Sequence, residues 1–219
     1  MKFLHILIFF IGTCNSIRLG RQMKKKKNEI ENEQTNLFKE NNIFEPDLKN
    51  NMDKKEITDI LVSLNIRIDD KGDIHQHGSF LIIAENELFC IELFQNTKKT
   101  TLWTVILNNT KDCKKRNDKP GNLRINHIKK DYSISSLFDT MFEKFYNEAP
   151  KNYGYLSLEA NNKITLESYL TNLDYHKKAN CLSFILCSLK EITNKDDSYN
   201  LVYDAIKTKA NTVINTKLN

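Results

Sequence analysis

The sequence predicts a single α+β domain, in which an antiparallel β-meander in the first half is followed by a mainly helical second half. Two observations support this class. Residues 79–108 contain three runs rich in β-branched and aromatic residues, separated by polar turns. From residue 134 onward, apolar residues recur at helical spacing. Strands gathered first and helices later are typical of α+β domains, and residues 52–210 are enough for one hydrophobic core.

The N-terminus has the layout of a signal peptide. One positive charge, Lys2, precedes an apolar run from Phe3 to Ile11 that only His5 interrupts. This run is much shorter than the roughly 20 apolar residues of a membrane-spanning helix. We expect cleavage after Ser16, which removes residues 1–16 and makes the protein secreted; a buried N-terminal strand or helix is the alternative.

The segment that follows, residues 17–51, is dominated by Lys, Glu, Asn and Gln. Such a composition cannot bury enough apolar surface to offset its ordering entropy, so we expect a disordered charged arm. We also expect a flexible C-terminal tail at residues 211–219. No later stretch reaches membrane-spanning length, because polar residues interrupt even the most apolar one, Ala179 to Leu189. The sequence therefore indicates no transmembrane segment.

Ordered structure is expected to begin near Asp53, which forms a capping-box-like pair with Glu56. The apolar residues that follow recur at helical spacing: Ile57, Ile60, Leu61 and Leu64. This spacing predicts a short amphipathic helix, followed by a strand at residues 66–69 and a turn at residues 70–72.

Three strands of the meander are expected at Ser79–Ala84, Leu88–Gln95 and Thr100–Asn108. In the third strand both alternating faces carry apolar residues. A strand that is apolar on both faces is buried on both, so this strand is expected to be central in the sheet.

Residues 109–130 are polar and basic, and Pro120 and Gly121 mark a turn among them. We expect a long loop or ribbon that binds an anionic partner through Lys111, Lys114, Lys115, Arg116, Lys119, Arg124, Lys129 and Lys130. No aromatic residue for base stacking lies among these charges, which argues against nucleic acid and favours a protein or an anionic glycan. A solvated charged loop without a partner is the simpler interpretation of this stretch taken by itself.

The rest of the chain is expected to form four helices, at residues 134–145, 165–173, 177–192 and 199–206. Pro150 ends the first of them, and one further strand is expected at Tyr153–Glu159. Thr165 can cap the second helix. The third helix is apolar nearly all round and should be central to the core.

Five cysteines are present, and loss of Cys14 with the leader leaves Cys90, Cys113, Cys181 and Cys187. An even number in an oxidising compartment permits two disulfides. Cys181 and Cys187 should lie on one helix about 120° apart, so they should not pair with each other. We expect cross-links between the Cys90 and Cys113 region and the Cys181 helix; four free buried thiols are the alternative.

Other candidate sites are sparse. Asn108, Asn109 and Thr110 form the one N-glycosylation sequon, expected to be exposed after a strand. His75 and His77 would share one face of a strand and could share a metal, but no third ligand is evident. Two exposed histidines on an edge strand are the preferred interpretation, with no metal or cofactor.

The stretch Tyr153–Leu170 resembles the hinge and the following helix of protein kinases, and the order of strands and helices is similar to that of the kinase small lobe. Lys119–Asn122 also looks like part of a kinase catalytic loop, but it precedes the hinge-like stretch, whereas a kinase has it afterwards. The Gly-rich loop and the His-Arg-Asp and Asp-Phe-Gly triplets are absent. The resemblance implies an inactive, degenerate kinase-like module.

No other catalytic pattern appears. The sequence has no P-loop, dinucleotide fingerprint or Gly-x-Ser-x-Gly elbow. A cysteine hydrolase could use a cysteine with His127 or His176, but no local signature surrounds any cysteine. We therefore expect no catalytic residues and a secreted, non-enzymatic protein that binds another macromolecule through the basic loop or the arm. A kinase-like scaffold and a structural coat component are the alternatives, and no pattern indicates an oligomeric state.

Overall fold

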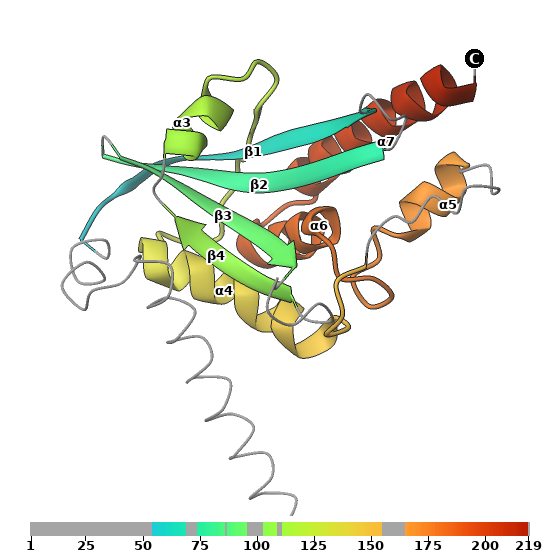
Figure 1. Cartoon of the computed structure of the whole chain (residues 1–219). Coiled ribbons are helices and arrows are strands. Elements are labelled where there is room, and N and C mark those ends of the chain that lie inside the picture. Colours follow the sequence, from blue (N-terminus) through green and yellow to red (C-terminus); the bar gives the residue numbers. More distant parts are fainter. Residues whose placement is uncertain are drawn as a thin grey trace, which may run out of the picture. The chain divides into compact units, whose positions relative to one another are not determined.

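The computed structural model describes residues 54–68, 74–85, 87–95, 103–108, 111–154 and 165–218. The expected signal peptide and charged arm lie outside these residues. The five strands are β1 (Ile57–Ile68), β2 (Ile74–Ala84), β3 (Glu87–Gln95), β4 (Trp103–Asn108) and β5 (Leu123–Arg124). The described helices are α3 (Lys111–Asn117), α4 (Ile134–Glu148), α5 (Leu166–Thr171), α6 (Cys181–Ile192) and α7 (Asp197–Leu218). The predicted α+β class is confirmed (Figure 1).

The strands form one antiparallel sheet in the order β4-β3-β2-β1-β5. Strands β1 to β4 are a simple meander, because each pairs with the next along the chain. Strand β5 has two residues and pairs with β1 only at Leu61 and Val62. Most of the long β1 strand therefore has no strand partner on that side among the described residues.

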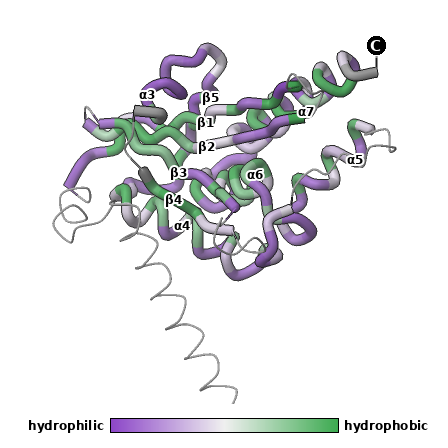
Figure 2. The backbone as a smooth tube through the Cα atoms, viewed as in Figure 1, coloured by the Kyte–Doolittle hydropathy of each residue, from purple (hydrophilic) through white to green (hydrophobic). Residues whose placement is uncertain are grey.

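Helices α4 and α6 lie on one face of the sheet and the short helix α3 on the other (Figure 1). On the first face, the rings of Phe80 and Phe184 meet edge to face with centroids 6.3 Å apart. A Cβ on Gly78 would come within 2.5 Å of Ile185 Cδ1, so α6 approaches β2 closely there. Hydrophobic residues concentrate in the strands and α6, while the connection from α3 to β5 is hydrophilic (Figure 2).

The segment expected as an amphipathic helix near residue 57 is strand β1 instead. Its apolar residues fit helical spacing, but Ile60, Val62 and Ile66 also fit a two-residue alternation, and all three are buried. The strand pairs with β2 from Ile57 to Ile68. Tertiary pairing and the β-branched content of this run outweighed the helical spacing.

The third predicted strand, β4, is an edge strand and not a central one among the described residues. Both of its faces carry apolar residues because α4 covers one of them: Trp103 packs against Phe142 and Phe145 of that helix. Trp103 Nε1 also donates a hydrogen bond of 2.6 Å to Pro150 O. Burial against a helix produced the same pattern as burial inside a sheet.

The predicted helices are present, with shifted ends. Ser133 caps α4, and Thr165 caps α5 as expected. Helix α6 begins after Asn180, whose side chain accepts hydrogen bonds from two backbone amides. Helix α7 continues through most of the expected tail because Val213 and Ile214 are buried. Among the described helices none combines the length and apolarity needed to cross a bilayer.

The kinase-like order of elements is not seen in the described part of the chain. All five strands of the sheet precede α4. Tyr153 does not join the sheet but forms one parallel bridge with Ala179, and residues 155–164 lie outside the described residues.

Candidate binding surface on helix α3

The region expected to be a long basic loop contains a helix, α3, that lies on the sheet face opposite α4 and α6. Cys113 and Arg116 are one helical turn apart, so their side chains share one face of the helix. Cys113 is buried and Arg116 is half-buried, whereas Lys114 and Lys115 between them are exposed. The helix therefore places two residues against the sheet and two lysines toward solvent.

Arg116 forms an ion pair with Glu92 of β3. The Glu92 carboxylate lies inside the face that α3 covers, and its side chain is only 2% exposed against 24% for Arg116. Arg116 Nη1 also lies 3.4 Å from His77 Nε2, and that nitrogen is 3.7 Å from Glu92 Oε1. Burial lowers the pKa of the Arg116 guanidinium, in agreement with its half-buried position.

Cys113 packs beside Cys90 of β3 and Leu81 of β2, and the three form one buried cluster. Leu61 and Leu88 border this cluster. Leu81 and Cys90 are direct cross-strand partners, so the register places both under α3. The apolar cluster and the Arg116 ion pair are the two anchors that fix α3 to the sheet.

The eight predicted basic residues differ in their surroundings. Lys114, Lys115 and Lys119 are exposed on α3 and the turn after it, while Arg116 points inward. Arg124 pairs with Asp59 at 2.5 Å. The side chain of Lys111 lies outside the described residues.

The last two basic residues belong to the segment after β5. Lys129 Nζ donates to Lys190 O at 2.9 Å. Lys130 Nζ lies 4.9 Å from the centre of the Tyr132 ring, a cation–π distance. Lys129 thus contacts α6, and Lys130 contacts a residue of its own segment. Both lie after α3 and β5 in the chain.

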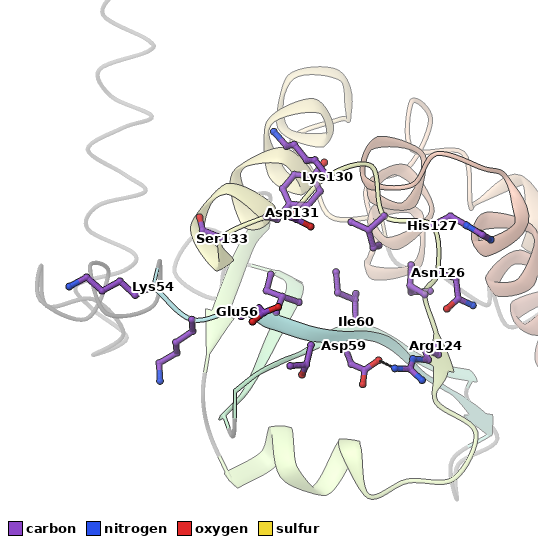
Figure 3. Close-up of a pocket in the computed structure, with 16 residues that line it drawn as sticks. Lys54, Glu56, Asp59, Ile60, Arg124, Asn126, His127, Lys130, Asp131 and Ser133 are labelled. Atoms are coloured by element: carbon purple, nitrogen blue, oxygen red, sulfur yellow. Dashed lines mark ion pairs between the residues drawn. The ribbon is translucent and has the colours of Figure 1, made fainter.

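A groove of about 660 Å³ lies between the start of β1 and residues 124–133 (Figure 3). Its lining includes apolar residues from both sides, such as Ile60 and Ile128. Charged residues of both signs surround them, including Glu56 and Asp131 as well as Lys130. The charged lining consists of Lys54, Lys55, Arg124 and Lys130 together with Glu56, Asp59 and Asp131, so neither sign of charge dominates.

The groove wall is fixed to the domain by backbone hydrogen bonds. Ile125 N donates to Ile60 O at 2.9 Å, and Asn194 N donates to His127 O at 2.8 Å. His127 has φ = 57°, in the left-handed region that non-glycine residues seldom adopt. Contacts with α6 and its following loop thus hold this segment in a strained conformation.

His77 and His75 share one face of β2, as the alternation predicts, but β2 is an interior strand. His75 is exposed, whereas His77 is half-buried beside Glu92 and Arg116. Within the described ranges, no group of three or more His, Cys, Asp and Glu side chains is arranged to hold a metal ion.

The structure brings His77 close to Cys181, a pairing that the sequence did not indicate. Burial raises the pKa of the Cys181 thiol, but hydrogen bonding and charge from His77, with hydrogen bonds from Tyr153 and Gly78, outweigh burial and lower it. Cys181 is fully buried, whereas the His77 side chain is 27% exposed. The pair is therefore a partly buried polar contact at the start of α6.

All four cysteines of the domain are free and buried. The expected cross-link from the Cys90 and Cys113 region to the Cys181 helix is not present. Cys90 lies opposite Leu81, whereas Cys181 Sγ lies 3.9 Å from Gln76 O, five residues earlier on β2. At about 3.3 Å per strand residue, the two sites are roughly 16 Å apart along β2. The thiols of Cys90 and Cys181 are therefore too far apart to form a disulfide.

The sequon asparagine, Asn108, is the last residue of β4 and the partner of Cys90 in the sheet. Its side chain and the next two residues lie outside the described structure, so glycosylation stays a prediction. The chain matches no protein-family model, and no curated protein and no solved structure shows significant similarity to it.

Proposed function

We propose that this protein is a non-enzymatic binding protein, and that the exposed lysines of α3 and its following turn contact an anionic partner, either an acidic protein surface or a glycan. Lys114, Lys115 and Lys119 form this basic patch. The observation that carries the proposal is that these side chains are exposed on α3 and on the turn after it, while the opposite side of the helix is fixed to the sheet by Cys113 and Arg116.

The fixed position of α3 matters for binding. A seven-residue helix is far too short to persist in water by itself, so its lysines would otherwise sample many arrangements. The two anchors remove much of this freedom before the partner arrives, and a pre-organised surface loses less entropy on association. Arg116 belongs to this support and not to the binding patch, which revises the set of eight basic residues.

The proposal is tested by heparin chromatography with a matched pair of triple variants. One variant replaces Lys114, Lys115 and Lys119 with glutamine. The control replaces Lys195, Lys207 and Lys209, which are exposed near or on α7, and removes the same total charge. The basic-patch variant should elute at a clearly lower salt concentration than both the wild type and the control, because clustered charges dominate salt-sensitive attachment.

Equal elution of the two triple variants would contradict the proposal, since it would show that only net charge matters. A circular dichroism spectrum of each variant checks that the fold is retained. The exchanged lysines are exposed, so we expect stability changes within about 0.5 kcal/mol per site.

We further propose that the protein acts after export. The apolar leader supports this proposal, and N-terminal sequencing of the mature protein tests it. A mature chain that begins near Ile17 would agree with export. A purified native product that still carries Met1 and is found in the cytosol would contradict it.

A further inference from the structure

We propose that Cys90 and Cys113 form a disulfide that ties α3 to β3, while Cys181 and Cys187 remain thiols. The bond requires an oxidising compartment, so it rests on the proposed export, but it requires no particular binding partner.

The first support is the contact between the two side chains. Cys90 and Cys113 belong to one buried cluster with Leu81, and the Cys113 side chain is a hydrogen-bond partner of the Cys90 thiol. They come from different elements, a strand and the helix lying on it, so a bond between them would connect segments that are otherwise held by noncovalent contacts. Both sulfurs are shielded from solvent, as in structural disulfides.

The second support is that the other two thiols have no comparable partner. Cys181 and Cys187 are six residues apart on α6, which places them about 9 Å apart along the helix axis and on different sides of it. Cys187 experiences the charges of Glu191, Lys144 and Glu148, so it lies in the contact between α6 and α4, away from α3. Among the four thiols of the described domain, one pairing therefore remains.

The reaction is an ordinary thiol–disulfide exchange with a small-molecule or protein disulfide as oxidant. The thiolate of one cysteine attacks the oxidant, forms a mixed disulfide and releases one reduced thiol. The second cysteine then attacks the mixed disulfide, and the new sulfur–sulfur bond forms as the other half of the oxidant leaves as a thiol. Two thiol protons and two electrons pass to the oxidant, which becomes two thiols.

The bond should form during folding, before α3 has docked. In the docked state the Cys113 hydrogen bond and burial raise the pKa of the Cys90 thiol, so little reactive thiolate is present. A short helix held by two anchors can also open locally at a lower free energy than the whole domain, which gives a slower route in the folded protein.

The full-length chain is used for the test, with Cys14→Ser so that four thiols remain. The protein is refolded in a reduced and oxidised glutathione mixture, its free thiols are alkylated in denaturant, and tryptic peptides are mapped without reduction. We expect the peptide of residues 72–98, which contains Cys90, to be linked to the peptide of residues 112–114, which contains Cys113. Cys181 and Cys187 should both be alkylated.

Thermal unfolding gives a second measurement. The disulfide closes a loop of about 24 residues, so the oxidised protein should melt about 7–14 °C above the reduced protein. Cys113→Ser should abolish this difference between oxidising and reducing buffers, and the control Cys187→Ser should retain it.

Two results would overturn the inference. One is a link that joins Cys90 or Cys113 to Cys181 or Cys187. The other is full alkylation of both Cys90 and Cys113 after oxidative refolding to a native circular dichroism spectrum. The peptide map is made on protein that retains all four domain cysteines. It therefore tests the disulfide even if the Cys113→Ser variant fails to fold.

Discussion

Replacing Arg116 with methionine tests the ion pair that fixes α3. The methionine keeps much of the aliphatic stem but removes the charge that faces Glu92. The Glu92 side chain is 2% exposed, so its carboxylate cannot recover the lost partner by turning to water. The substitution therefore removes the permanent positive charge and leaves the Glu92 carboxylate beside His77, whose Nε2 lies 3.7 Å away and is charged only when protonated.

The magnitude follows from this burial. Removing one partner of a buried ion pair costs about 3–5 kcal/mol, because the remaining charge stays desolvated. That loss is a large part of the 5–15 kcal/mol that stabilises a typical domain. Replacing both partners with apolar side chains of similar size is often neutral. The double variant Arg116→Met, Glu92→Met should therefore be more stable than Arg116→Met alone, even though it carries one more substitution.

Chemical denaturation measures these differences. Trp103 is the single tryptophan of the chain and is buried against α4, so its fluorescence reports unfolding. The control is Lys114→Met, which removes the same charge from an exposed position two residues earlier on the same helix. It should change the free energy of unfolding by no more than about 0.5 kcal/mol.

Two outcomes would refute this reasoning. If Arg116→Met and Lys114→Met lower stability equally, the ion pair contributes no more than a surface charge does. If the double variant is less stable than Arg116→Met, the buried Glu92 carboxylate is not the source of the loss.

Two further predictions concern the opposite face of the sheet. Gly78→Ala should lower the free energy of unfolding by about 1–2 kcal/mol in chemical denaturation, because the new methyl group would overlap the buried Ile185. The control Gly154→Ala meets only the flexible Lys178 side chain and should lower it less. Burial, followed by the negative charge of a nearby glutamate, raises the pKa of Cys187 to about 12 from its ordinary value of 9.0. Above pH 9 the unfolded chain loses this proton while the folded protein keeps it, so the free energy of unfolding should fall by up to about 1.4 kcal/mol per pH unit. Cys187→Ala should show a shallower fall with pH. Equal slopes of unfolding free energy against pH for the wild type and the variant would contradict this.

The fold class was predictable because the strongly periodic elements are also the most buried ones. Strand β2 and helices α4 and α6 each have one dominant pattern, and they form the centre of the core. The residues of β1 fit two periods at once, and only pairing with β2 over eleven residues decides between them. The sequence of residues 57–68 alone does not determine whether this segment is a helix or a strand, because the pairing with β2 decides it.

The candidate surface was only partly predictable. Composition located the basic segment, but it did not separate the lysines that face solvent from Arg116, which faces the sheet. The indication was in the sequence: Cys113 and Arg116 are three residues apart, and a buried acid, Glu92, interrupts the apolar run of β3. A charged residue within a strand of otherwise buried residues indicates that a cation lies across the sheet face. The position of that cation depends on chain folding after β4, which periodicity does not predict.

The two anchors of α3 differ in what they demand of their surroundings. The ion pair between Arg116 and Glu92 forms in any redox state, but its contribution to stability depends on its burial. The proposed bond between Cys90 and Cys113 needs an oxidant, and once formed it does not depend on burial. In a reducing compartment α3 would rest on the ion pair and the packing of two thiols, whereas after export it would be held covalently. The rigidity of the basic patch, and with it the entropic cost of binding, would then be greatest in the compartment where the partner is expected.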